Sequence, residues 1–90
     1  MHAVVVRVKI GDVEIARKGL REQIVPRVSQ APGFVAGYWT SSEDGHGGLS
    51  MLVFESEETA RGAAEMINQG GAPETVTLEN VEVREVVEHA

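Results

Sequence analysis

Two adjacent aromatic residues, Tyr38 and Trp39, are the first candidates for a binding site. They are the only tyrosine and the only tryptophan in the chain. A flat aromatic ligand could stack on either ring, while the phenol O–H or the indole N–H orients an oxygen atom of the ligand. Neighbouring residues of a strand point to opposite faces of a sheet, so at most one of them lines a given cavity. The alternative is structural: one ring fills the core and the other a subunit interface.

Other residues could move protons or hold charge. His46 lies in the glycine-rich segment 42–48, and an imidazole titrates near neutral pH, as an acid–base catalyst must. Arg7 and Lys9 lie in an otherwise aliphatic run, where they could hold an anionic substrate or pair with acidic side chains. We take His46 and Arg7 as candidate catalytic residues. The alternatives are an exposed loop histidine without a role and a solvated pair of cations.

The sequence offers little for a metal or a cofactor, and we expect neither. The chain has no cysteine, which excludes disulfides and thiolate ligands. His2 and His89 would approach each other if the first and last strands were neighbours, but Glu88 is the only nearby third ligand, and frayed termini are the better interpretation. The glycines around His46 lack the Gly-Lys-Ser/Thr signature of a phosphate-binding loop.

Length and composition predict one small domain, residues 1–90. Hydrophobic residues make up 42% and charged residues 24% of the chain, as in soluble globular proteins. The net charge of -6 repels nucleic-acid phosphates, so we expect no nucleic-acid partner. No apolar run of about 18 residues and no secretory signal occur, so we expect a cytoplasmic protein with no membrane contact.

Hydrophobic periodicity predicts four strands and two helices that position these residues. The strands show β-branched and aromatic runs, and the helices show apolar residues every three or four positions. The glycine-rich segment between the second and third strands predicts a β-hairpin. The predicted elements are a strand at 3–10, a helix at 13–29, strands at 34–41 and 49–55, a helix from Ser56 to Gly70–Gly71, and, after Pro73, a strand at 81–87.

The first predicted helix contains two residues that disfavour a straight helix. Gly19 costs about 1 kcal/mol relative to alanine, and Pro26 lacks the amide that would bond to Glu22. We therefore expect a bend near Pro26 or two helical pieces. Asp12 is the predicted N-cap. Four basic residues are expected to form the solvated face of this helix: Arg17, Lys18, Arg21 and Arg27.

The order strand, helix, strand, strand, helix, strand predicts an α+β, ferredoxin-like βαββαβ fold with both helices on one face of a four-stranded antiparallel sheet. Residues 4–6 and 51–54 are apolar on both faces of their strands. In the second strand Phe34 and Tyr38 are expected on one face, and Val35 and Trp39 on the other. A sheet with one wet face would alternate strictly. We therefore predict a homodimer in which a second copy covers the other sheet face.

Three short segments, together with the element order, carry a resemblance to a known superfamily. They are Ala31-Pro32-Gly33-Phe34, the Tyr38-Trp39 pair, and Phe54-Glu55-Ser56. With them the chain resembles the dimeric α+β barrel superfamily, and within it the small antibiotic biosynthesis monooxygenase-like proteins. The resemblance implies a cavity between helices and sheet. Its members include cofactor-independent monooxygenases acting on aromatic polyketides, haem-degrading enzymes, muconolactone-type isomerases and proteins without a known reaction.

The chain departs from the catalytic patterns of these relatives. Haem-degrading members use a helix histidine as an iron ligand, and neither predicted helix contains a histidine. The polyketide oxygenases use asparagine and tryptophan, but Asn68 and Asn80 are the only asparagines here, so no catalytic set is transferred. We expect a homodimer that resembles cofactor-independent monooxygenases or isomerases acting on small aromatic compounds. The alternatives are a non-catalytic ligand-binding or stress-associated dimer, and an acidic protein-interaction partner.

Overall fold

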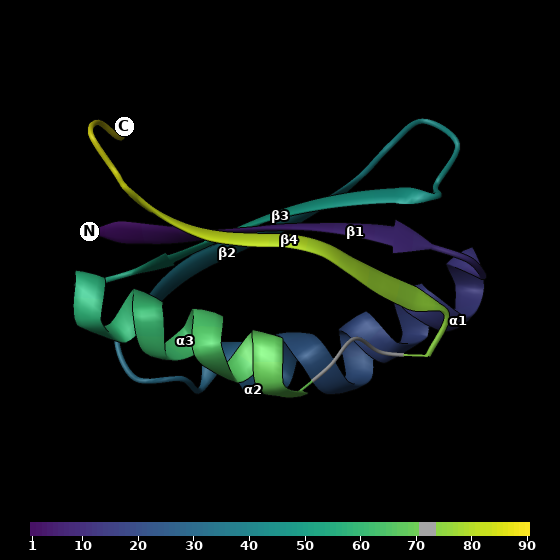
Figure 1. Ribbon diagram of the computed structural model, residues 1–90, viewed down its shortest axis with the longest axis horizontal. Helices are drawn as coiled ribbons and strands as arrows, with labels where there is room; N and C mark the ends of the chain where they lie inside the picture. Colours follow the sequence, from purple (N-terminus) through teal and green to yellow (C-terminus); the bar gives the residue numbers. More distant parts are fainter. Residues whose placement is uncertain (71–73) are drawn as a thin grey trace.

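A computed structural model describes residues 1–70 and 74–90 and contains one four-stranded sheet covered by helices on one face (Figure 1). The strand order is β2-β3-β1-β4, and every pair of neighbouring strands is antiparallel. This arrangement confirms the predicted ferredoxin-like βαββαβ fold. The elements are β1 (His2–Ile10), α1 (Val13–Gly19), the π-helical turn η1 (Leu20–Ile24), α2 (Val25–Ser29), β2 (Phe34–Ser41), β3 (Gly47–Phe54), α3 (Glu57–Gly70) and β4 (Val76–Glu85).

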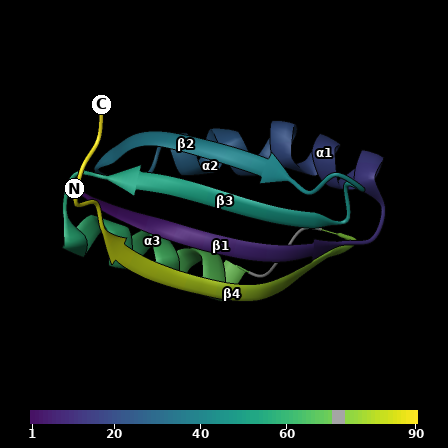
Figure 2. The same cartoon turned by 90° about the horizontal axis from the view of Figure 1, so that it is seen from above.

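The two helical segments lie under opposite halves of the sheet. Seen from above, α1 and α2 run along the β2 edge, whereas α3 runs below β1 and β4 (Figure 2). We call the sheet face toward the helices the helix side and the opposite face the outer face. The helix side carries the core of the protein.

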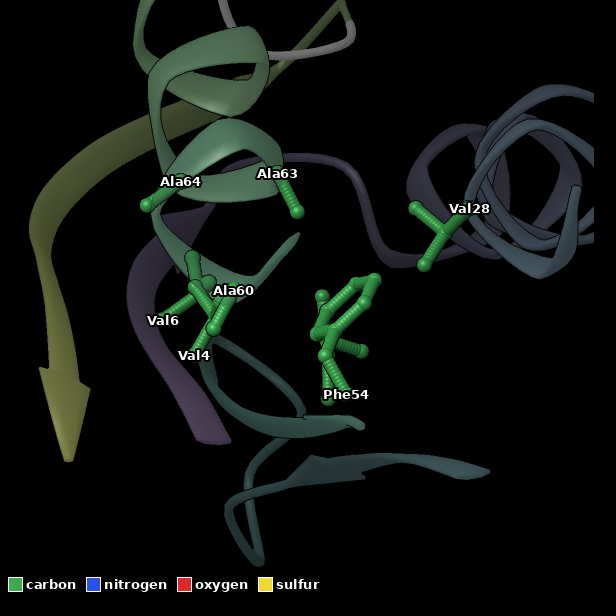
Figure 3. Packing of buried hydrophobic residues seen from close by; sticks show 8 residues of the cluster. Val4, Val6, Val28, Phe54, Ala60, Ala63 and Ala64 are labelled. Carbon is green, nitrogen blue, oxygen red and sulfur yellow. The ribbon is translucent and has the colours of Figure 1, made fainter. Parts of the chain in front are cut away.

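The core is centred on Phe54, which is fully buried (Figure 3). The ring of Phe34 meets it edge-on, with centroids 5.8 Å apart and planes at 78°, a favourable aromatic geometry. The side of α3 that faces Phe54 carries only alanines, which let the helix approach the sheet closely. The other members of the core are Val4, Val6, Val28, Leu52, Ala60, Ala63 and Ala64.

Residues 13–29 form one continuous helical path, but with a wide turn in its middle. Asp12 caps its start by accepting a hydrogen bond from the backbone N–H of Ile15 at 3.0 Å, as predicted. Near the centre, the N–H of Val25 bonds to the carbonyl of Leu20, five residues back. The π turn therefore lies between Gly19 and Pro26. The hydrogen-bond spacing of the helix therefore changes just before Pro26, which has no amide N–H to continue the regular series of helical hydrogen bonds.

One extra residue in β2 overturns the expected grouping of its aromatic side chains. Phe34 pairs with Phe54 and Ala36 with Val53, so Val35 has no partner in the β2–β3 register. Such a bulge reverses the alternation of side chains. Phe34 therefore shares the helix side with Trp39, and the expectation that it shares a face with Tyr38 is wrong.

A second irregularity explains why the last strand differs from the prediction. β4 covers Val76–Glu85 rather than residues 81–87, and its register shifts opposite Arg7 and Val8. Because of the shift, even-numbered residues before it and odd-numbered residues after it lie on the helix side, so apolar and polar residues do not alternate strictly along the β4 sequence. The second predicted helix ends at Gly70, as expected. Gly71 and Pro73, which the sequence analysis placed between this helix and the last strand, lie outside the described residues.

Truncation of Phe54 tests the importance of this core. We expect Phe54→Ala to lower the free energy of unfolding by about 3–5 kcal/mol, because it removes a fully buried ring and leaves a cavity. The matched control is Ile15→Ala, at a residue 44% exposed on α1, with an expected loss below about 1 kcal/mol. Urea unfolding at one fixed protein concentration measures both values. Equal losses would contradict this assignment of the core.

Candidate functional site

Beside the core, the space between helices and sheet holds a cavity of about 490 Å³. Its position follows from β3, whose helix-side residues become smaller along the strand: Phe54, Leu52, Ser50 and Gly48. Phe54 fills the space at one end. At the other end Ser50 and Gly48 are small, and Val8 packs over Gly48 and takes part of the room. Most of the lining is aliphatic and comes from all the surrounding elements, including Val8, Ile10, Leu20, Ile24, Ile67 and Leu78.

Trp39 forms part of the sheet side of this cavity. Its ring lies along β2 over Gly37, where an added β-carbon would come within 2.9 Å of the indole. Ser50 is its register partner on β3 and also lines the cavity. Among the described residues, neither the indole N–H nor the Ser50 hydroxyl has a hydrogen-bond partner. An aromatic surface and two polar groups are thus available to a ligand.

Three arginines line the helical side of the cavity: Arg17, Arg21 and Arg27. The sequence analysis placed them on the solvated face of the helix, and their side chains are exposed. They nevertheless line the cavity, because a long charged side chain can cover apolar surface with its stem while its head stays in water. Arg17 and Arg21 directly follow Ala16 and Leu20, two apolar residues that also line the cavity. This adjacency is the signal in the sequence for their position at the cavity.

His46 lies outside the cavity lining and holds the β2–β3 turn against the end of β1. Its Nδ1 is 2.8 Å from the carbonyl oxygen of Ile10, so Nδ1 carries the proton of this hydrogen bond. Its backbone N–H donates to the Asp44 carboxylate at 2.9 Å, and the Ser42 hydroxyl donates to the same oxygen at 2.7 Å. These two bonds hold the pKa of Asp44 below its usual value. The contacts give His46 a structural position.

Tyr38 and Arg7 lie on the outer face, away from Trp39 and from the cavity. Tyr38 pairs with Met51, and Arg7 pairs with Leu49. Tyr38 is 66% exposed, and Arg7 is exposed as well. The structure therefore does not bring the four candidate residues together: Trp39 lines the cavity, His46 holds a turn, and Tyr38 and Arg7 face outward.

The outer face is apolar at its centre. Tyr38, Met51 and Val5 are neighbours across β2, β3 and β1 in one row of the sheet. Met51 is 48% and Leu49 45% exposed. Charged residues border this apolar centre: Arg7 lies on β1 beside Leu49, and Arg84 and Glu82 form an ion pair at 2.9 Å on β4. One face of the sheet thus carries the core and the cavity, and the other carries an uncovered apolar surface.

The two terminal histidines do not form a metal site in the described part of the chain. His2 pairs with Glu85, where β4 ends, and His89 lies beyond the strand. Across residues 1–70 and 74–90, no three His, Asp or Glu side chains are grouped so that they could hold a metal ion. No helix in the same residues has the length and apolar character needed to cross a membrane.

Comparison with solved structures identifies the fold. No protein-family model and no curated protein matches the sequence. A dimeric ferredoxin-like protein from an uncultured marine organism superposes with a TM-score of 0.67 and 14% identity, covering 100% of this chain and 98% of the other. A monooxygenase from the ActVA-Orf6 gene of Streptomyces coelicolor, solved in complex with nanaomycin D, gives a TM-score of 0.58 and 14% identity, with coverages of 99% and 92%. The chain therefore shares the ferredoxin-like fold with these solved structures.

Proposed function

We propose that this chain forms a homodimer whose helix-side cavity binds a small aromatic compound and oxidises it without a metal or flavin. The observation that carries the proposal is the cavity of about 490 Å³ with the single tryptophan in its lining. Small-molecule sites typically have volumes of about 300–1,000 Å³ and apolar walls with a few polar groups. The monooxygenase with the same fold and a bound ligand supports this class of reaction.

The chemistry demands little of the protein. An anthrone-type compound loses a proton from its ring methylene to water, and the resulting carbanion transfers electrons to O₂ and forms a C–O bond with it. The peroxide takes up a proton to give a hydroperoxide, whose O–O bond breaks as the second methylene proton leaves with hydroxide as water, so CH₂ and O₂ become C=O and H₂O. In the cavity, Trp39 stacks on the ring, and its N–H and the Ser50 hydroxyl are positioned to donate to the oxygen on which the anionic charge develops.

A specific observation favours a second candidate, binding without turnover. Among the described residues that line the cavity, no side chain is a carboxylate, an imidazole or a phenol. These are the usual groups that accept a proton near neutral pH. A protein of this kind holds its ligand in the apolar space without assisting its deprotonation.

Titration with anthraquinone and turnover of anthrone separate the two candidates. Because Trp39 is the only tryptophan and lines the cavity, we expect a bound anthraquinone to quench its fluorescence saturably. Trp39→Phe, measured by calorimetry, should weaken binding by about 2- to 10-fold through loss of the larger ring and the N–H. The matched control Tyr38→Phe on the outer face should change affinity less than about twofold.

Oxygen uptake measured with anthrone then assigns the function. One O₂ consumed per anthrone, faster than without protein, supports the monooxygenase. Saturable binding without uptake supports the ligand-binding alternative. Neither binding nor uptake across a panel of such compounds would contradict both.

The apolar outer face supports the proposed dimer. Tyr38, Met51 and Leu49 together expose a contiguous apolar surface on β2 and β3, and such patches mark interaction sites. A second copy presents the same surface, so a two-fold contact buries each patch against its equivalent. The dimeric ferredoxin-like protein, similar over the whole of this chain, supports the assembly.

A charge at the centre of the outer face tests this assembly. We expect the wild type to sediment at micromolar concentration with twice the chain mass of 9.7 kDa. Met51→Glu should weaken the dimer by at least about 10-fold, because the carboxylate must be desolvated in the contact. Ile15→Glu introduces the same charge at an exposed residue of α1 and should leave the dimer intact. A wild-type monomer would overturn the proposal.

A further inference from the structure

We propose that the ligand of the cavity carries an anionic oxygen group, a carboxylate or an ionised phenol, which is held by Arg17, Arg21 and Arg27. This inference rests on the proposed binding of a small aromatic compound and adds the charge of that compound. Its starting point is an imbalance. The chain has 14 acidic and 8 basic residues, yet the described lining of the cavity contains three arginines and no aspartate or glutamate.

These three guanidinium groups are not used by ion pairs within the described chain. The ion pairs found there are Arg61–Glu57 on α3 and Arg84–Glu82 on β4. The acidic residues of the same helical segment, Glu14 and Glu22, do not line the cavity. Each guanidinium therefore keeps its planar set of N–H donors, which match the two oxygens of a carboxylate.

The helical path brings the three groups to one side of the cavity. Arg17 and Arg21 are four residues apart, about one turn along the helix. Arg27, on α2, reaches toward the end of α3, where its Nη1 lies 3.9 Å from the position that a β-carbon of Gly70 would take. Its guanidinium thus lies between the two helical segments that border the cavity.

The opposite sides of the cavity differ in charge, which orients the ligand. The sheet side provides the indole of Trp39 and the uncharged Ser50 hydroxyl among aliphatic side chains, and the helical side provides Arg17, Arg21 and Arg27. A compound with a flat apolar body and one acidic group satisfies both. Its rings lie against Trp39, and its anionic oxygens point toward the first helical segment.

The effect on affinity is moderate, because the arginine side chains are exposed. Ion pairs at exposed positions are individually weak and are screened by salt. We expect a carboxylate to bind about 10-fold more tightly than its neutral isostere at low ionic strength, with each arginine contributing about 2- to 5-fold.

Calorimetry with anthraquinone-2-carboxylate and its neutral carboxamide tests the inference. The test variant combines Arg17→Gln with Arg21→Gln. The matched control combines Lys18→Gln with Lys9→Gln, so it also removes two positive charges. Lys18 and Lys9 do not line the cavity, so this control removes the same total charge from elsewhere. Each titration is run at about 50 mM and about 500 mM salt, which shortens the screening length from about 14 Å to about 4 Å.

We expect the double arginine variant to lose about 5- to 20-fold in affinity for the carboxylate and less than about twofold for the carboxamide. The double lysine variant should change both by less than about twofold, and high salt should weaken only the carboxylate. Equal affinity of the wild type for the two compounds overturns the anionic ligand but leaves the aromatic site supported. If the arginine and lysine variants lose the same affinity for the carboxylate, the effect is one of total charge, and the proposed role of the arginines is overturned as well. If neither compound binds, the proposed function fails together with this inference.

Discussion

The packing of Phe54 against the alanines of α3 sets the distance between the helices and the sheet. Ala60 and Ala63 bring α3 close, and Val28 closes the contact from α2, so the ring fills its end of the interlayer space. The same β3 strand then presents Ser50 and Gly48 at a spacing that is already fixed. A serine and a glycine do not fill this space; Val8 packs over Gly48, and the rest of the space is the cavity. The core and the site are therefore consequences of one size gradient along one strand.

The sheet separates two tasks between its faces. Consecutive residues Tyr38 and Trp39 point in opposite directions, Trp39 into the cavity and Tyr38 onto the outer face. The bulge at Val35 adds Phe34 to the side of Trp39 and so strengthens the core. Since β2 and β3 contribute to both faces, contact with a second copy on the outer face would stiffen the strands that carry the cavity. In the proposed dimer, assembly and ligand binding would thus be mechanically connected without sharing a residue.

The sequence predicts the order of elements, their approximate bounds and the apolar character of both sheet faces, because these depend on local periodicity. It does not predict the bulges opposite Phe54 and Arg7, because a register shift depends on which strands pair. Those shifts decided the face of Phe34 and the start of β4. The cavity was expected only from the resemblance, and its arginines were missed, because an exposed residue next to an apolar stripe is assigned to solvent. His46 and Arg7 are candidates because an imidazole can transfer a proton and a guanidinium can hold an anion. The chemistry of a side chain does not by itself place it in a cavity.

An acidic protein that attracts an anion presents an apparent contradiction, which distance resolves. The net charge of -6 repels an anion from far away, but in physiological salt charges are screened beyond about 8 Å. The described lining of the cavity contains Arg17, Arg21 and Arg27 and no carboxylate. The charge of the lining is therefore positive although the net charge of the whole molecule is negative. An acidic surface with a basic opening also disfavours binding of large polyanions, which must face the whole surface, while it admits a small one. At the proposed anion site, this charge distribution would select ligands by size as well as by sign.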